Sequence, residues 1–169
     1  LSGKVDHIYG AVNGIEGVLA EKFLDLGKKL DSAEKISLLM QTPAAALGSC
    51  RYKLGDPEEN KEDFEEILQI FRRHEIRYFI YIGGNDSMDT VDKMSKYCKE
   101  NGVDDVFVVG APKTIDNDLV ETDHCPGFGS AAKYLAATFA ELERDCHVYE
   151  KKAVTIVEVM GRNAGWRRA

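Results

Sequence analysis

The stretch that decides the fold runs from Tyr78 to Ser87 and reads YFIYIGGNDS. Its first half is a continuous apolar run, which is typical of a strand in a parallel sheet that is covered on both faces. Two glycines and polar residues follow, and a helical pattern of apolar residues begins after them. A strand, a glycine-rich turn and a helix in this order indicate an α/β fold whose ligands bind at the carboxyl ends of the strands.

Further elements of the same kinds extend outward from this stretch. Apolar runs at 106–109 and 153–159 predict two more strands, and apolar periodicity predicts helices at 57–74, 87–100 and 129–145. The first 55 residues predict a short strand at 7–12 and helices at 15–26 and 33–40. The predicted fold class is therefore α/β: an open, mostly parallel, three-layer Rossmann-like sheet with helices on both faces.

The composition is that of one globular domain. The chain has 169 residues, 44% of them hydrophobic, and a formal net charge of -7. This acidic balance, without a Lys/Arg-rich block, argues against a nucleic-acid or membrane-surface partner. No apolar run reaches the roughly 18 residues of a membrane-spanning helix.

The cysteines predict a compartment rather than a site. The four of them form no CxxC pair, which indicates reduced thiols in a cytoplasmic protein. The pairs His124-Cys125 and Cys146-His147 have the wrong spacing for a zinc site, so we interpret them as core thiols and surface imidazoles.

The segment after the first apolar run is a candidate phosphate site. Gly83 and Gly84 would let backbone N–H groups approach an anion closely, and the N-terminus of the next helix would add a partial positive charge. The alternative is a tight turn with Asp86 as the helix N-cap. This segment alone favours neither interpretation.

The segment after the second run, GAPKTIDND at 110–118, combines a cation with clustered carboxylates. Asp116 and Asp118 bracket Asn117, and Lys113 precedes them. Such a cluster is costly unless a useful group lies opposite. A carboxylate can accept a proton from a hydroxyl, and a lysine can stabilise a transferring phosphoryl group. An ordinary Asp/Asn turn is the alternative.

After the third run, Arg162 is either a phosphate ligand or a surface charge.

One motif predicts a different chemistry. Residues 127–132 read GFGSAA and fit the G-x-G-x-x-A dinucleotide fingerprint of an oxidoreductase. That fingerprint requires a strand directly before its first glycine, whereas a polar stretch ending in Pro126 precedes Gly127. The context therefore argues against a nicotinamide cofactor.

These segments together resemble the phosphofructokinase family, and within it the pyrophosphate-dependent branch. The resemblance covers nearly the whole chain and rests on YGAVNGIEGVL, LGSCR, GGNDSMDT, APKTIDNDL, DHCPGFGSAAKY and VEVMGRNAGW, in the family's order and spacing. It implies a phosphofructokinase-like fold and Mg²⁺-dependent phosphoryl transfer from pyrophosphate to the 1-hydroxyl of fructose 6-phosphate, giving fructose 1,6-bisphosphate. Phosphoryl transfer consists mostly of positioning and charge stabilisation, which suits these loops.

The resemblance also implies roles for individual residues. Asp116 matches the general base, Lys113 stabilises the transferred group together with Mg²⁺, and Asp118 is a second acidic residue of the catalytic loop. Asn85 stands where relatives often have an aspartate ligand for Mg²⁺. The implied donor-phosphate contacts are Gly84, Asp86, Ser87, Arg51 and Lys113. The implied sugar-phosphate contacts are Thr114, Ile115, Asp116, Met160, Gly161 and Arg162.

Two residues decide between donors. ATP-using relatives commonly have glycine in place of Asp86 and Lys113, and a carboxylate at position 86 would repel the α-phosphate of a nucleotide. The rival hypotheses are an ATP-dependent 6-phosphofructokinase and a non-catalytic regulatory or phosphate-binding relative. Clustered carboxylates beside a lysine argue against the second.

The resemblance sets an expectation for the organisation of the chain as well. Residues 1–169 are expected to form a single, incomplete donor-side domain, which lacks the family's first phosphate loop and its second, sugar-binding domain. Such a piece is expected to be inactive by itself, and the full-length protein to form a homo-oligomer.

Overall fold

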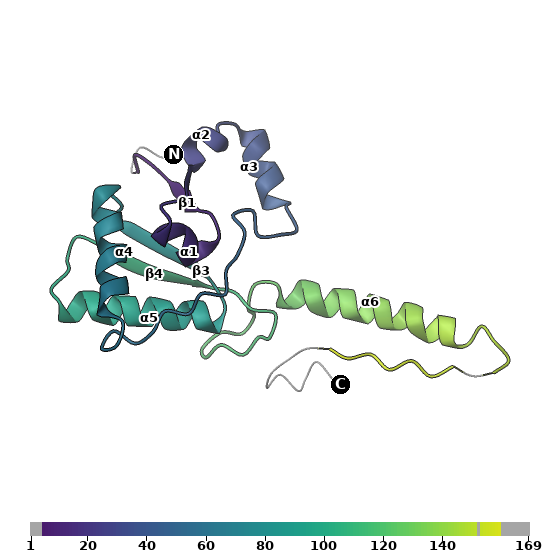
Figure 1. Cartoon of the computed structure of the whole chain (residues 1–169). Coiled ribbons are helices and arrows are strands. Elements are labelled where there is room, and N and C mark those ends of the chain that lie inside the picture. Colours follow the sequence, from purple (N-terminus) through teal and green to yellow (C-terminus); the bar gives the residue numbers. More distant parts are fainter. Residues whose placement is uncertain (1–4, 152, 160–169) are drawn as a thin grey trace. The chain divides into compact units, whose positions relative to one another are not determined.

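A computed structural model describes residues 5–151 and 153–159, and Figure 1 shows their helices and strands. The chain divides into two compact units. Unit 1 comprises Leu1–Tyr81 and Thr90–Val109, and unit 2 comprises Ile82–Asp89 and Gly110–Ala169. The idea that both belong to one incomplete domain stays a prediction.

Unit 1 begins with a small antiparallel sheet. Strand β1 (Tyr9–Ala11) pairs with β2 (Phe23–Asp25), and helix α1 (Gly14–Leu19) connects them. The strand predicted at 7–12 is confirmed, but the helix predicted at 15–26 is wrong beyond Leu19. Glu21 adopts a positive φ of 50°, which an α-helix does not accommodate, and the chain returns as β2.

Two short helices follow this sheet. They are α2 (Leu26–Lys29) and α3 (Ala33–Met40), and the second confirms the helix predicted at 33–40. The Ser32 side chain accepts a hydrogen bond from the backbone N–H of Lys35 at 3.2 Å. This bond satisfies one of the donors that a helix N-terminus leaves without a partner.

The predicted strand-helix-strand pattern comes next along the chain; its strands end, and its helix begins, in unit 2. Helix α4 (Lys61–Arg73) precedes strand β3 (Tyr78–Gly83), and helix α5 (Asn85–Glu100) leads to strand β4 (Phe107–Pro112). The backbone N–H of Phe107 donates to the carbonyl of Arg77, and that of Lys113 donates to the carbonyl of Gly83. Both bonds join residues at the same separation along the chain, which is the pattern of parallel strands. The α/β fold is therefore confirmed.

Helix α4 begins later than its sequence predicts. The expected start at Asp56-Pro57 is wrong, since the helix begins at Lys61. The Asp56 carbonyl accepts hydrogen bonds from the N–H groups of Glu59 and Asn60, which closes a separate turn. The Asp56 carboxylate forms an ion pair with Lys93 at 3.1 Å instead of capping the helix.

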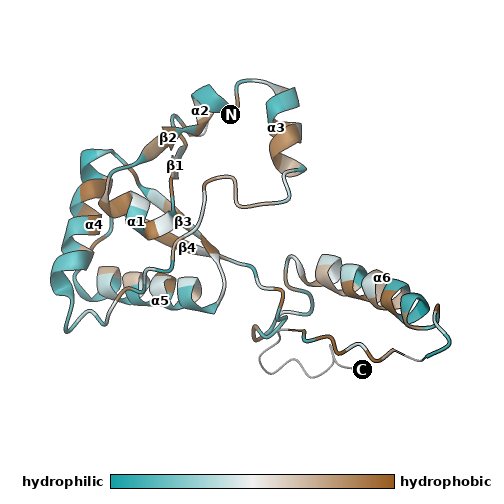
Figure 2. Ribbon diagram, turned by 45° about the vertical axis from the view of Figure 1, so that its right-hand side comes forward, coloured by the Kyte–Doolittle hydropathy of each residue, from teal (hydrophilic) through white to brown (hydrophobic). Residues whose placement is uncertain are grey.

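The core of unit 1 lies around α4. The buried side chains of this helix are Phe64, Ile67, Leu68, Ile70 and Phe71. Phe64 contacts Tyr97 of α5 with ring centroids 4.9 Å apart, and Phe71 contacts Phe79 of β3 at 5.0 Å. Figure 2 shows the hydrophobic and hydrophilic sides of this amphipathic helix. Full burial of one such phenylalanine contributes about 1.5–3 kcal/mol.

The two faces of β3 differ in exposure. Phe79 and Tyr81 pack against the core of unit 1, whereas Tyr78 and Ile80 on the opposite face are exposed. The Tyr78 ring stacks on Phe107 of β4 at a centroid distance of 5.4 Å. The exposed face is therefore apolar and aromatic.

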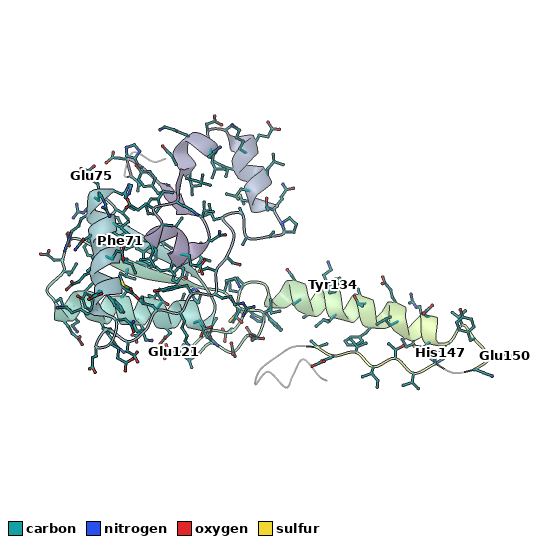
Figure 3. The ribbon with its side chains drawn as sticks, viewed as in Figure 1. Phe71, Glu75, Glu121, Tyr134, His147 and Glu150 are labelled. Atoms are coloured by element: carbon teal, nitrogen blue, oxygen red, sulfur yellow. The ribbon has the colours of Figure 1, made fainter. Side chains whose placement is uncertain are left out.

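Unit 2 contains helix α6 (Phe128–Cys146), which confirms the helix predicted at 129–145. None of its residues is buried, and Tyr134, labelled in Figure 3, is 70% exposed. The strand predicted at 153–159 is wrong: these residues form no strand and pair with none in the described chain. Val154 and Ile156 are exposed, and Thr155 Oγ1 lies 3.1 Å from Cys146 Sγ of α6. Among the described residues, no helix is both long and apolar enough to cross a membrane.

Candidate active site

The candidate site lies in unit 2, where the carboxyl ends of β3 and β4 lead into two loops. The backbone N–H of Lys113 donates to the carbonyl of Gly83 at 2.8 Å, which extends the ladder of the two strands to the point where both loops begin. A Cβ atom built on Gly84 would lie 3.5 Å from the carbonyl oxygen of Lys113. The glycine loop (residues 83–87, which include the first turn of α5) and the acidic loop (residues 113–118) are therefore neighbours, as expected for the ends of parallel strands.

The first loop turns directly into helix α5. Residue 83 is glycine for a steric reason, because a Cβ atom there would collide with the side chain of Ser87. The Gly84 carbonyl accepts a hydrogen bond from the N–H of Met88 at 3.0 Å, which closes the first turn. Asp86 is exposed in that turn, where a carboxylate interacts favourably with the helix dipole. A helix N-terminus preceded by two glycines can hold an anion.

The second loop is ordered by the buried side chain of Thr114. Its hydroxyl accepts a hydrogen bond from the backbone N–H of Asp116 at 3.1 Å and donates to Asp116 Oδ2 at 3.3 Å. This arrangement fixes one carboxylate oxygen of a half-buried aspartate. A carboxylate held in this way can act as a proton acceptor for a hydroxyl placed nearby.

A side-chain hydrogen bond joins the two loops. The Asn85 amide nitrogen donates to Asp118 Oδ2 at 3.3 Å. The other oxygen, Asp118 Oδ1, is buried and has no hydrogen-bond partner in the described structure. A buried carboxylate oxygen without a partner is costly and indicates that a cation or donor group completes the site.

The structure brings together most of the residues that the sequence singled out. Those placed in the two loops of unit 2 are Gly84, Asn85, Asp86, Ser87, Lys113, Thr114, Ile115, Asp116 and Asp118. Arg51 is an exposed residue of unit 1, so its role stays a prediction. Met160, Gly161 and Arg162 lie outside the described residues.

The start of α6 also contributes to this region. Gly127 precedes the helix with a φ of 93°, and a Cβ atom there would lie 3.2 Å from Ile115 Cγ2. A loop, and no strand, precedes Gly127 in the described chain, so the structural context of a dinucleotide fingerprint is missing. The sequence places Gly127 in the rejected fingerprint and in the family segment DHCPGFGSAAKY, and neither predicts a conformational reason for a glycine there. The left-handed backbone and close packing are the actual reasons for a glycine here.

The prediction of a core thiol is confirmed for Cys125, which is buried, whereas the sequence predicts for Asn117 only a place in a turn. Asn117 adopts a φ of 50°, and its side-chain oxygen accepts the backbone N–H of buried Cys125 at 2.7 Å. An asparagine between two aspartates in a turn is the available signal, because asparagine tolerates the left-handed region. Its partner is eight residues away along the chain, and that pairing is not visible in the sequence.

Comparison with known proteins identifies the family. The phosphofructokinase family profile matches residues 2–167. The chain belongs to the phosphofructokinase family. It is 47% identical over 164 residues to the pyrophosphate--fructose 6-phosphate 1-phosphotransferase of Xanthomonas campestris, and 45% identical over 165 residues to that of Methylococcus capsulatus. These matches cover 96% of this chain but 38% and 39% of the relatives, so the chain spans about two fifths of their length.

Solved structures agree in fold. The pyrophosphate-dependent phosphofructokinase of Marinobacter aquaeolei matches with a TM-score of 0.80 and 43% identity, over 98% of this chain and 40% of that one. The corresponding protein of Nitrosospira multiformis matches with a TM-score of 0.77 and 44% identity, over 86% of this chain and 35% of that one.

Proposed function

We propose that this chain forms the donor side of an enzyme that transfers a phosphoryl group from pyrophosphate to the 1-hydroxyl of fructose 6-phosphate. The observation that carries the proposal is the junction of the two strand-end loops, which places Asp86 and Lys113 in the same small unit as the Asp116 carboxylate. The names of the relatives that are 45–47% identical support the choice of substrates.

In the proposed reaction Asp116 accepts the proton of the sugar's 1-hydroxyl. The hydroxyl oxygen forms a bond to the terminal phosphorus of pyrophosphate, and the bond from that phosphorus to the bridging oxygen breaks. Orthophosphate leaves with the bridging oxygen. Lys113 and the backbone N–H groups at the start of α5 stabilise the charge on the phosphoryl oxygens.

The loops also fit a magnesium ion. The described residues contain no group of three or more His, Cys, Asp or Glu side chains arranged to hold a metal. Mg²⁺ does not need such a group, since it commonly takes one or two protein carboxylates and completes its shell with phosphate oxygens and water. Asp118 would supply its buried Oδ1 and Asn85 its amide oxygen, because Asn85 Nδ2 already bonds to Asp118. Bound Mg²⁺ would neutralise phosphate charge.

The choice of pyrophosphate over ATP rests on Asp86 and Lys113. Asp86 is exposed at the N-terminus of α5, where a phosphate bound to that helix would meet it. A carboxylate there repels the α-phosphate of a nucleotide, and the lysine adds a charge toward a donor that lacks an adenosine group.

The remaining assignments follow from the same function. Thr114, Ile115, Met160, Gly161 and Arg162 bind the sugar phosphate, and Gly84, Ser87 and Arg51 bind the donor phosphates. The complete protein works as a homo-oligomer in the cytoplasm. The compartment is consistent with four free cysteines.

The test is the initial rate of fructose 6-phosphate phosphorylation by the complete gene product, with Mg²⁺ and either pyrophosphate or ATP. We expect turnover with pyrophosphate, and loss of it in the double variant Asp86→Gly with Lys113→Gly. Asp89→Gly is the matched control, because it also replaces an aspartate of α5 with glycine, one turn further along the helix. Turnover with ATP alone, or undiminished pyrophosphate turnover in the double variant, would refute the donor assignment. No turnover with either donor would favour a non-catalytic relative.

A further inference from the structure

Asn117 lies between Asp116 and Asp118 and ties their loop to the segment that enters α6. Its amide nitrogen donates to the carbonyl of Asp123 at 3.1 Å, and its Oδ1 accepts the N–H of Cys125 at 2.7 Å. The side chain therefore bonds to one donor and one acceptor of another backbone segment. If the Asn117 side chain were removed, water would take the place of both bonds. The two backbone segments would then lose the direct link that this side chain provides.

The segment that Asn117 holds is itself anchored. The Cys125 side chain is 3% exposed, and its carbonyl accepts a hydrogen bond from the N–H of Phe128, the first residue of α6, at 3.1 Å. Gly127 then packs close to Ile115 of the acidic loop. The loop is thus held against the beginning of a 19-residue helix.

The two aspartates of the acidic loop have hydrogen bonds of their own. Thr114 orients Asp116 through two hydrogen bonds, and Asn85 bonds to Asp118 from the glycine loop. These bonds orient the two carboxylates and hold the backbone N–H of Asp116, but none of them reaches residues 123–125. Asn117 makes that connection, because its side chain bonds to the backbone of residues 123–125, whereas the side chains of Asp116 and Asp118 bond elsewhere.

We propose that Asn117 is a positioning residue that sets the place of the Asp116 carboxylate by fastening residues 114–118 to residues 123–125. The inference rests on the proposed function, since it assigns Asp116 to the reaction. A carboxylate displaced by about 1 Å from a reacting hydroxyl can cost roughly 100-fold in rate. Most of the proposed donor contacts in unit 2 (Gly84, Asp86 and Ser87) belong to the other loop, and Lys113 precedes the fastened residues 114–118, so donor binding should be affected much less.

An ordinary turn is the competing explanation, because asparagine accepts a φ of 50° more readily than most residues. Asn117→Gly separates the two explanations. Glycine adopts the left-handed region without strain and lacks only the side-chain bonds. If φ is the sole reason for asparagine, glycine should serve equally well.

The experiment uses the complete gene product and compares Asn117→Gly with Asn101→Gly. Asn101 lies just after α5 and its side chain also bonds to a backbone carbonyl, that of Tyr97, at 2.9 Å. The control therefore loses a comparable bond in unit 1. We expect Asn117→Gly to lower kcat with pyrophosphate by about 10- to 100-fold and to leave the KM for pyrophosphate nearly unchanged. Asn101→Gly should leave both constants near the wild-type values.

A second measurement tests the fastening without relying on activity. Hydrogen-deuterium exchange should become faster in peptides spanning 114–126 of Asn117→Gly, because the Cys125 N–H loses its acceptor. Unchanged exchange would overturn the fastening. An active wild-type protein with unchanged kcat in Asn117→Gly, or an equal loss in Asn101→Gly, would overturn the positioning role. An inactive wild-type protein would overturn the proposed function and this role together, and the exchange experiment would still decide the fastening.

Discussion

The adjacent glycines at the end of β3 should respond in opposite ways to the same substitution. In Gly83→Ala the new methyl group would overlap both Ser87 Cβ and Ser87 Oγ. The backbone at the start of α5 must then move. In Gly84→Ala the methyl group would lie 3.5 Å from the Lys113 carbonyl oxygen, which is an ordinary contact. Gly84 also lies outside the left-handed region, so alanine fits its backbone.

The expected magnitudes follow from these contacts. Overpacking at residue 83 should cost about 1–3 kcal/mol of stability. Gly84→Ala should leave stability unchanged or raise it by about 0.4–1 kcal/mol, because alanine reduces the freedom of the unfolded chain. The same methyl group would stand where, in the proposed function, the donor phosphate approaches the N-terminus of α5. Loss of one hydrogen bond to a charged phosphate is worth about 1.5–3 kcal/mol, which corresponds to roughly a 10- to 100-fold increase in the KM for pyrophosphate.

The assay combines thermal unfolding with steady-state kinetics of the complete gene product. Gly83→Ala should lower Tm, whereas Gly84→Ala should not lower it. Gly102→Ala is a further control that isolates backbone strain from steric overlap, since its Cβ atom would meet nothing within 4 Å while its φ of 64° is one that alanine rarely adopts. If Gly84→Ala keeps a normal KM for pyrophosphate, the phosphate does not bind above this glycine. If it lowers Tm as much as Gly83→Ala does, the steric reasoning is wrong.

Three further outcomes are expected. Phe64→Ala removes a fully buried ring from the core and should cost about 3–5 kcal/mol, measured by urea unfolding; a loss below about 1 kcal/mol would contradict the packing described. Hydrogen bonds from Arg72 lower the pKa of Asp105, so they stabilise the folded protein above the unfolded-state pKa of about 3.9, and this stabilisation is lost as pH falls through the lower folded-state pKa. Asp105→Asn should therefore destabilise the protein near neutral pH but not at strongly acidic pH. An equal loss of stability at both pH values would refute this prediction. Burial raises the pKa of the Cys98 thiol, so iodoacetamide should label Cys98 more slowly than half-buried Cys50 in the native protein, and equal rates by mass spectrometry would contradict this.

Much of the fold was predictable because apolar periodicity reports which side of an element is buried. The face of α4 that carries Phe64, Ile67 and Phe71 is the face that packs in unit 1. The same reasoning failed at 153–159, where Val154, Ile156 and Val157 are exposed and no residue pairs with a strand in the described structure. An apolar run favours a strand, but a strand forms only where a neighbouring edge supplies hydrogen bonds.

Element boundaries were less predictable, because they depend on partners distant in sequence. Asp56 and Pro57 have the pattern of a helix start, yet Asp56 forms an ion pair with Lys93 and the helix begins at Lys61. Likewise, Glu21 adopts a left-handed conformation that ends α1 and lets β2 pair with β1.

The sequence by itself determined the strand-helix-strand order around α5, the buried face of α4, and the concentration of glycine and acidic residues in loops at strand ends. It could do so because these features depend on local spacing along the chain. Only the tertiary structure decided that Asn85 bonds to Asp118, that Asp118 Oδ1 is buried without a partner, and that Asn117 holds the backbone of Cys125. Such contacts depend on which strand ends become neighbours and on the φ angles of individual loop residues, and residue types and their spacing do not specify either.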